Sequence, residues 1–235
     1  MALKTVQFRY GADNLGYLIH GKRTALAVDG GAVDAICEYL SDNGLELAGI
    51  VNTHSHGDHT SGNDELTRCT GAPLTDMDEL HRMEKLVLED QPIRIILTPG
   101  HTVDSVCFHH GNDLLTGDTL FNGKVGRCFT GDTRAFFESI GKLLRFPDGT
   151  FIHAGHDYLL EYLETASQLD PENRLIEVYR DGYDPCRPLT ATLGWEKKVN
   201  PFIRHNQPMF IALMSSMGLP VNTEYERFSS MLTLM

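Results

Sequence analysis

Residues 53–62 have the sequence THSHGDHTSG and directly follow the apolar run LAGIVN. On an extended strand, side chains two positions apart point the same way, so His54 and His56 can bind one ion together. Asp58 and His59 follow at a turn into a helix, where they can reach a second ion nearby. This H-x-H-x-D-H pattern at the end of a strand predicts a metal centre.

Three later apolar runs end in the same way, and each supplies one further candidate ligand. His101 lies in TPGHT, Asp118 in LLTGDT and His156 in FIHAGHDY. Imidazole and carboxylate ligands without a thiolate suit zinc, iron or manganese, and one carboxylate can bridge two ions. We therefore expect two divalent metal ions, with His54, His56 and His101 at one ion, Asp58, His59 and His156 at the other, and Asp118 between them. The ligands alone leave the choice among zinc, iron and manganese open, and zinc is our first expectation.

The composition restricts the partners. The chain has 235 residues and a formal charge of -12, which argues against broad binding to nucleic acid or to an anionic membrane. An anionic small substrate would need a local cluster of Arg or Lys. The first residues do not resemble a signal peptide, and no run approaches the roughly 18 apolar residues of a membrane span. Five cysteines form no CxxC pair, which favours reduced thiols and a cytoplasmic location.

The order of the patterns predicts an α/β (α+β) fold in two parts. Helical patterns lie at 32–44 and 133–144, and they prevail after about residue 158. The runs expected to form strands are 6–10, 16–20, 24–29, 47–54, 93–98, 104–110, 113–118 and 150–155. We expect a catalytic domain at 1–165 and a C-terminal helical, substrate-binding appendage at 166–235.

The ordered set H-x-H-x-D-H, TPGHT, TGD and GH resembles the metallo-β-lactamase fold superfamily. The resemblance implies a four-layer αββα sandwich with metals at one edge of its sheets. More narrowly, TGDTLF, GHDY, DPEN and NPFIR resemble glyoxalase II, the hydroxyacylglutathione hydrolases. This narrower resemblance implies cleavage of a glutathione-linked thioester, such as S-lactoylglutathione, by a metal-bridging hydroxide. Asp58 would act as the catalytic residue that orients the hydroxide and takes up its proton.

The same resemblance implies residues that bind the glutathione carrier. Arg127 stands where the family has a basic residue, Phe129 stands where it often has an aromatic one, and Tyr158 belongs to GHDY. Arg204 of NPFIR supplies a C-terminal arginine, whose planar fork suits a carboxylate. Asp29, at the end of TALAVD, is a candidate partner for a ligand histidine, or else a turn-forming residue.

Two segments leave alternatives open. After NPFIR the chain continues HNQP, without the further basic residues of glyoxalase II, and the segment FIALMSSMGLPVNTEYERF resembles the tail of persulfide dioxygenases. Those enzymes use one iron to oxidise glutathione persulfide. The alternatives are therefore a mononuclear-iron persulfide dioxygenase, a metallo-hydrolase of another substrate, and a metal-binding module without activity. Seven ligands favour a catalytic site, because structural zinc sites are closed and four-coordinate.

Overall fold

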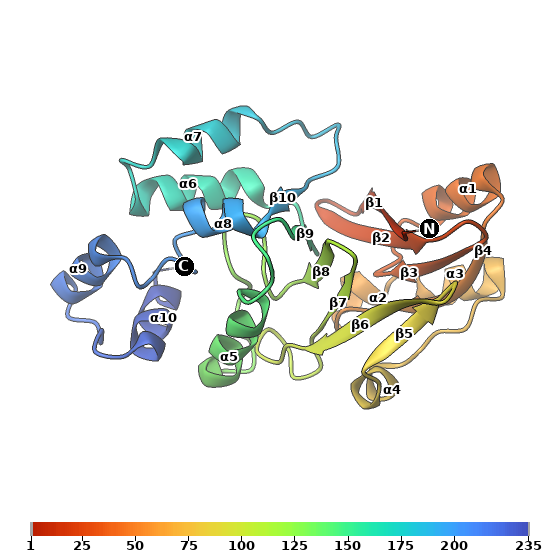
Figure 1. Ribbon diagram of the computed structural model, residues 1–235, viewed down its shortest axis with the longest axis horizontal. Coiled ribbons are helices and arrows are strands. Elements are labelled where there is room, and N and C mark those ends of the chain that lie inside the picture. Colours follow the sequence, from red (N-terminus) through yellow and green to blue (C-terminus); the bar gives the residue numbers. More distant parts are fainter. Residues whose placement is uncertain (1, 235) are drawn as a thin grey trace.

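The computed structural model describes residues 2–234, which form two β-sheets with helices on their outer faces (Figure 1). The first sheet has the strand order β1-β2-β3-β4. Only β3 and β4 of this sheet run parallel; the other neighbours are antiparallel. Its strands are β1 Lys4–Tyr10, β2 Asn14–His20, β3 Thr24–Val28 and β4 Glu46–Val51.

The second sheet has the order β10-β9-β8-β7-β6-β5, and only β8 and β9 run parallel. Its strands are β5 Lys85–Leu88, β6 Gln91–Leu97, β7 Val106–His110, β8 Asp113–Gly117, β9 Phe151–Ala154 and β10 Ala191–Thr192. Parallel strands end at the same edge of a sheet. The segments after β8 and β9 therefore leave together, as do the segments after β3 and β4.

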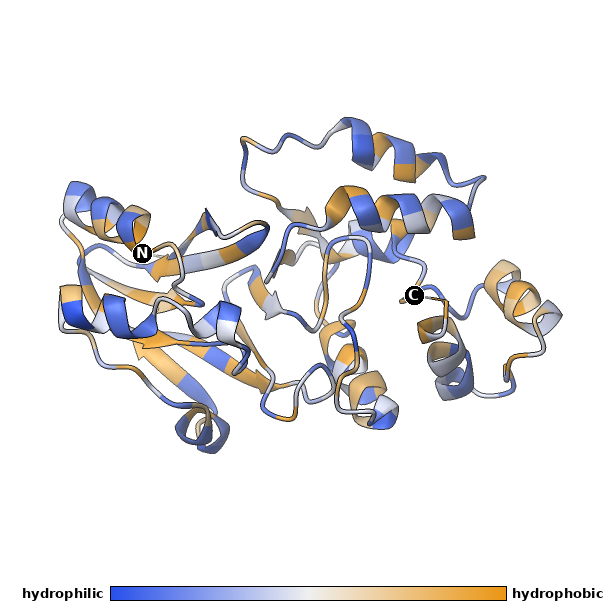
Figure 2. Ribbon diagram, turned by 180° about the vertical axis from the view of Figure 1, so that it is seen from behind, coloured by the Kyte–Doolittle hydropathy of each residue, from blue (hydrophilic) through white to orange (hydrophobic). Residues whose placement is uncertain are grey.

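Helices cover the outer face of each sheet. Figure 1 shows α9 and α10 at the opposite end of the molecule from α1, and Figure 2 shows α9 as largely apolar. The helices are α1 Val33–Asn43, α2 Gly57–Thr60, α3 Asn63–Thr70, α4 Met77–Arg82, α5 Thr133–Leu143, α6 Leu159–Leu169, α7 Arg174–Asp181, α8 Leu193–Val199, α9 Pro208–Ser216 and α10 Glu224–Leu232. Within residues 2–234 none of them is long and apolar enough to cross a membrane.

Three apolar cores separate the layers. Strand β2 alternates between two of them: Tyr17 packs into the core between the sheets with Phe108 of β7, whereas Leu18 packs with Ile36 of α1. The third core joins the second sheet to α5, α9 and α10 through side chains that include Phe136. Helix, sheet, sheet and helix therefore follow one another, which confirms the four-layer αββα sandwich.

The expected strands all appear, with ends displaced by a few residues. The sequence analysis did not identify β5, β10, α3 or α4: the two strands span only four and two residues, and the two helices are short and carry few apolar residues. The expected boundary near residue 165 falls inside α6, whose Leu163 and Ala166 belong to the core between the sheets. The division at 165 stays a prediction.

We expect the core between the sheets to dominate stability. Leu115 of β8 is fully buried there, so Leu115→Ala should lower the free energy of unfolding by about 2–5 kcal/mol through lost burial and a cavity. Leu160→Ala, at a helix position 48% exposed, is the matched control and should change it by less than about 1 kcal/mol. Chemical denaturation measures both, and equal losses would contradict this account of the core.

Candidate metal centre

The loop after β4 carries the first ligands. His54 follows the strand closely and is buried, and its Nε2 lies 2.9 Å from Nδ1 of His56. His101, in the loop after β6, brings its Nε2 to 3.1 Å from the same His56 nitrogen. Its Nδ1 lies 2.9 Å from the carbonyl oxygen of Arg127, which accepts a hydrogen bond from it and leaves Nε2 without a proton when the ring is neutral. Three ring nitrogens thus surround one point.

A second group lies beside the first. Helix α2 holds His59, whose Nε2 lies 3.1 Å from Nε2 of His156 after β9. Asp58 Oδ2 lies 3.6 Å from the His59 nitrogen and 3.3 Å from the His156 nitrogen. His59 and His156 are buried, whereas the Asp58 side chain is 48% exposed. One side of this group is therefore open to solvent.

Asp118 lies between the two groups. Its Oδ2 is 3.4 Å from His101 Nε2 and 3.5 Å from His156 Nε2. Within residues 2–234 its Oδ1 is buried without a hydrogen-bond partner, although His59 Nε2 lies 3.4 Å away. Gly155 permits this crowding, because a Cβ there would lie 2.2 Å from Asp118 Oδ1. The structure therefore brings all seven expected ligands together around one carboxylate.

The geometry fits divalent metal ions. Ligand atoms of His54, His56, His101 and Asp118 lie within 4.8 Å of one another, and so do those of the other three residues. Ligands about 2.0–2.1 Å from a tetrahedral zinc lie about 3.3 Å apart, close to the nitrogen spacing observed here. A cation would also satisfy the unpaired Oδ1 of Asp118. The αββα fold and this cluster together imply that the protein binds divalent metal.

The carboxylate of Asp29 orients one of the histidines. Asp29 Oδ2 lies 3.0 Å from Nδ1 of His59, a candidate ligand, and this contact agrees with one of the two roles that the sequence analysis left open for Asp29. Its other oxygen accepts a hydrogen bond from the Thr53 backbone N–H at 2.8 Å. Asp29 has a φ of 52°, a left-handed conformation that Asp tolerates better than most residues. Such partners set the ring orientation and raise the basicity of the ligand.

The sequence analysis missed two residues of the β1–β2 turn. Asp13 Oδ1 lies 2.8 Å from His156 Nδ1, and Asn14 Nδ2 donates to Asp58 Oδ2 at 2.8 Å. In the sequence they belong to the polar turn GADN, which no local pattern separates from an ordinary hairpin turn. Only the pairing of the sheet edges brings this turn to the cluster.

The two groups differ in proton affinity. Burial lowers the pKa of His54 to about 4 and also lowers the pKa of His101, so these rings are neutral at pH 7. Burial disfavours the charged form of His59 as well, but the carboxylates of Asp29 and Asp118 outweigh it and raise its pKa to about 11. The pKa of His156 is raised despite burial by its contact with Asp118.

Both carboxylates of the cluster are ionised at neutral pH. Burial alone would raise the pKa of Asp118, but His156 and His59 hold it far below its usual range. Burial also opposes ionisation of Asp58, and the hydrogen bond from Asn14 together with His59 holds its pKa below the usual value. The proton on His59 thus balances negative charge that metal cations would otherwise balance.

Three of the expected substrate-binding residues lie at the rim. The exposed ring of Phe129 stands edge-on to His101 at 5.2 Å, and the Arg127 guanidinium lies 5.0 Å from the Phe129 ring. Tyr158 stacks on His156 with ring centroids 4.8 Å apart and planes within 6°. These side chains border the cluster on two sides.

Arg204 does not join them. Its guanidinium donates to Asp170 at 2.7 Å and to Gln207 at 2.7 Å, and its side chain is only 9% exposed. The guanidinium also lies over the ring of Phe210. The expectation that Arg204 binds a substrate carboxylate is therefore not supported, because Asp170, on the loop before α7, already occupies its fork.

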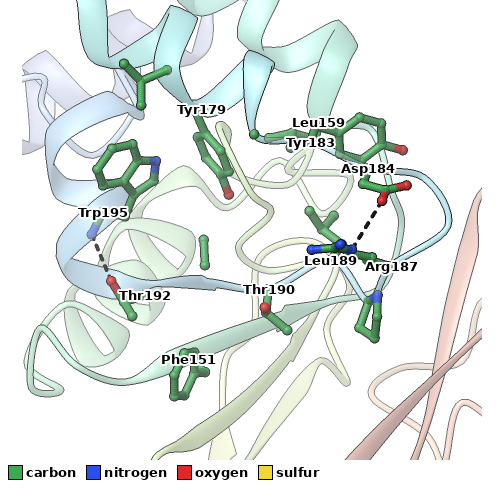
Figure 3. Close-up of a pocket in the computed structure, with 14 residues that line it drawn as sticks. Phe151, Leu159, Tyr179, Tyr183, Asp184, Arg187, Leu189, Thr190, Thr192 and Trp195 are labelled. Carbon is green, nitrogen blue, oxygen red and sulfur yellow. Dashed lines mark hydrogen bonds and ion pairs between the residues drawn. The ribbon is translucent and has the colours of Figure 1, made fainter.

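A cavity, called the cationic cavity below, is linked to the cluster through Arg127, whose carbonyl oxygen accepts the hydrogen bond from His101. It has a volume of about 620 Å³, and its lining includes Lys124, Arg127, Tyr162 and the acidic Glu161 but none of the seven expected ligands. Lys124 Nζ lies 4.7 Å from the centre of the Tyr162 ring. Two cations against one carboxylate give this cavity the local positive charge that the acidic chain would need for an anionic substrate. A separate cavity of about 470 Å³, shown in Figure 3, is lined by residues such as Tyr179 and Trp195 and contains none of the seven ligands.

Known proteins resemble this chain in sequence and in fold. Residues 15–85 match the family model described as the metallo-beta-lactamase superfamily. The hydroxyacylglutathione hydrolase of Rhizobium meliloti (strain 1021) is 32% identical over 233 residues, which cover 91% of each chain. The protein of the same name from Anaeromyxobacter dehalogenans (strain 2CP-C) is 35% identical over 218 residues, 85% of each chain. The crystal structure of ETHE1 from Myxococcus xanthus superposes with a TM-score of 0.65 at 22% identity, over 98% of this chain and 100% of that one, which supports the fold.

We expect metal loading of the two groups to depend differently on pH. A metal must displace the proton from His59 at pH 7, and the raised pKa of His156 adds to this competition, whereas His54 and His101 already present lone pairs at pH 7. Affinity at the Asp58–His59–His156 group should therefore rise roughly tenfold per pH unit for each proton released, the His59 proton at least. Calorimetric titration of the metal-free protein with Zn²⁺, in buffers of different ionisation enthalpy, measures both.

The metal-free protein provides a second check on the same protons. Because the folded pKa of His59 is raised, its contribution to stability is complete below about pH 6.5 and is lost as the pH rises toward about 11. Metal-free protein should therefore lose stability as pH rises from about 7 to about 9, and metal should reverse this. Two groups that load with the same pH slope and release no proton would contradict the assignment.

Proposed function

Because the chain belongs to the metallo-beta-lactamase superfamily and, within it, to the hydroxyacylglutathione hydrolase family, we propose that it hydrolyses S-hydroxyacylglutathione thioesters. The observation that carries this proposal is the seven-ligand cluster together with Arg127, which lines the cationic cavity with Lys124 and whose carbonyl oxygen accepts a hydrogen bond from His101 of the cluster. The cluster suits activation of water, and the cavity suits an anionic thiol carrier. A closed structural metal site would need neither the cavity nor an open side.

We propose two metal ions, with zinc as the first candidate and iron or manganese as alternatives. His54, His56 and His101 would hold one ion, Asp58, His59 and His156 would hold the other, and Asp118 would contribute one oxygen to each. When bound, such ions act as Lewis acids that lower the pKa of a water molecule and polarise a carbonyl oxygen. The absence of thiolate ligands leaves the choice among these metals to experiment.

Asp58 is the catalytic residue in this proposal. Within residues 2–234 the hydrogen bonds and ion pairs of its carboxylate all fall on Oδ2, to Asn14, His59 and His156. Oδ1 is therefore left to orient the attacking water and to accept its proton. The lowered pKa of Asp58 keeps the carboxylate ionised for this role. The leaving thiolate needs little acid catalysis, because thiols ionise at only moderately alkaline pH.

The glutathione carrier would lie along the rim and in the cationic cavity. Arg127 and Lys124 would face its carboxylates, while Phe129 and Tyr158 would border the thioester. All five cysteines are free, which accords with the proposed cytoplasmic, reducing location. We propose no nucleic-acid or membrane partner, in keeping with the acidic net charge of -12.

Metal analysis together with thioester hydrolysis tests the proposed function. We expect about two metals per chain and hydrolysis of S-lactoylglutathione that is lost on chelation and restored by metal. The released glutathione can be followed with a thiol reagent. A single iron, no thioester cleavage, and oxygen uptake with glutathione persulfide would overturn the proposal in favour of the dioxygenase.

Arg127→Ala tests the carrier site. Loss of the guanidinium should raise KM for S-lactoylglutathione about tenfold with little change in kcat, because the group binds the carrier and not the reacting carbonyl. An N-acetylcysteamine thioester, which lacks carboxylates, should be cleaved as by the wild type. Arg23→Ala, at an exposed position in the turn between β2 and β3, is the charge-matched control. An unchanged KM in Arg127→Ala would show that the guanidinium does not meet the substrate.

A further inference from the structure

Residues 118–127 form a short hairpin between β8 and α5. Gly126 N–H donates to the carbonyl of Thr119 at 3.1 Å, and Phe121 N–H donates to the carbonyl of Lys124 at 2.9 Å. The turn at its tip is Asn122-Gly123, where Gly123 has a φ of 86°. These bonds make the segment a defined unit and not an irregular loop.

The hairpin joins the metal cluster to the cationic cavity. It begins at the ligand Asp118, and at its other end the carbonyl of Arg127 accepts a hydrogen bond from His101. Its two strands approach so closely at Gly126 that a Cβ there would lie 1.7 Å from the Asp118 carbonyl oxygen. Lys124 and Arg127, the cations of the cavity, both project from it. Any movement of the hairpin would therefore shift those cations relative to the cluster.

Glu196 of α8 holds the tip of this hairpin. Its carboxylate is fully buried, and Oε2 accepts the Gly123 N–H at 2.7 Å and Asn200 Nδ2 at 3.3 Å. Oε1 accepts the Tyr179 hydroxyl at 3.1 Å and Asn122 Nδ2 at 3.4 Å. Figure 3 shows Tyr179 between Trp195 and Leu159, on the inner side of the 470 Å³ cavity. Two of the four donors come from the hairpin tip and two from the C-terminal helical region.

The burial of this carboxylate is energetically unfavourable. Within residues 2–234 no cationic side chain forms an ion pair with Glu196, and burial raises its pKa to about 7 even though its hydrogen bonds oppose the shift. A buried charge of this kind stabilises a fold less than a well-packed apolar side chain. The four hydrogen bonds of Glu196 are better explained by a role in positioning the hairpin. The Gly123 N–H at the turn requires an acceptor, and the Glu196 carboxylate supplies it at a fixed place.

We propose that Glu196 is a positioning residue: by holding the Gly123 N–H it fixes the 118–127 hairpin, and so sets the distance of Lys124 and Arg127 from the metal cluster. The preference of the enzyme for a glutathione thioester over a neutral thioester then depends on the length of the Glu196 side chain. This inference rests on the proposed thioester hydrolysis. It adds a residue of the C-terminal region that contacts neither substrate nor metal.

Two conservative variants separate reach from charge. Glu196→Asp keeps the charge, but its side chain is one methylene group shorter, so the carboxylate no longer reaches the Gly123 N–H. Glu196→Gln removes the charge but keeps an oxygen that can accept the hydrogen bond from Gly123. The measured quantity is the ratio of kcat/KM for S-lactoylglutathione to kcat/KM for a neutral N-acetylcysteamine thioester, at about pH 8 with full metal loading. We expect Glu196→Asp to lower this ratio about tenfold, mainly through KM, and Glu196→Gln to keep it within about twofold. Glu172→Asp, at an exposed glutamate, is the matched control.

A merely structural role would lower thermal stability in both variants without moving the ratio. An unchanged ratio in folded, metal-loaded Glu196→Asp overturns the proposal, and so does a loss in Glu196→Gln as large as in Glu196→Asp. If Glu196→Asp does not fold, hydrogen exchange in Glu196→Gln decides: peptides covering 118–127 must stay as protected as in the wild type, and faster exchange there overturns the proposal. Failure of the wild type to cleave S-lactoylglutathione would instead refute the proposed function, and the exchange measurement would still test the hairpin.

Discussion

Asp118 places a buried carboxylate among imidazole nitrogens from separate segments of the chain, 3.4 Å from His59 and His101 and 3.5 Å from His156. A charge with so little exposure requires positive charge close by. In the metal-free chain the proton on His59, whose pKa is raised to about 11, supplies this charge, and the pKa of His156 is raised as well. Divalent ions would supply it more strongly and would release that proton. The strand order of the second sheet meets this need for nearby positive charge. Strands β8 and β9 run parallel, so Asp118 and His156, which follow them, lie at the same edge of the sheet.

The two groups of candidate ligands differ in proton affinity because their neighbouring residues differ. His54 and His101 lose proton affinity through burial, and the His101 ring is oriented by a neutral backbone carbonyl. His59 and His156 each face a carboxylate on the far side of the ring, Asp29 and Asp13. Such carboxylates make an imidazole more basic and so a stronger ligand. The group that includes Asp58 is also the more open one, which suits the residue assigned to the attacking water.

The sequence predicted the sandwich, and it predicted that the seven candidate ligands would lie close together, because their segments follow apolar runs and strand ends meet at a sheet edge. The same reasoning could not find Asp13 and Asn14. Their turn carries no pattern of its own, and only the isolated bridge between Asn14 and His156 brings it to the cluster. It did not foresee the surroundings of Arg204 for a related reason: a family motif places the residue in the chain, but its ion pair with Asp170 is a tertiary contact that the motif does not reveal. Local pattern thus predicts what lies on strands, and it fails where a turn or a helix meets a distant partner.

The C-terminal helices illustrate this limit most clearly. In the segment LGWEKKVN, Glu196 looks like one more charged residue on a solvated helix, yet it is fully buried while the neighbouring Lys197 reaches the exposed Asp148. Helix α8 carries no metal ligand, but through Asn122 and Gly123 it contacts the hairpin that begins at Asp118. If the proposed roles of Lys124, Arg127 and Glu196 hold, chemistry and carrier recognition are coupled through one short hairpin, which is held by the metal cluster at its base and by a buried carboxylate at its tip. A change in the C-terminal helices would then alter which thiol carrier is accepted without touching a ligand, so substrate preference would diverge among proteins that keep the same metal centre.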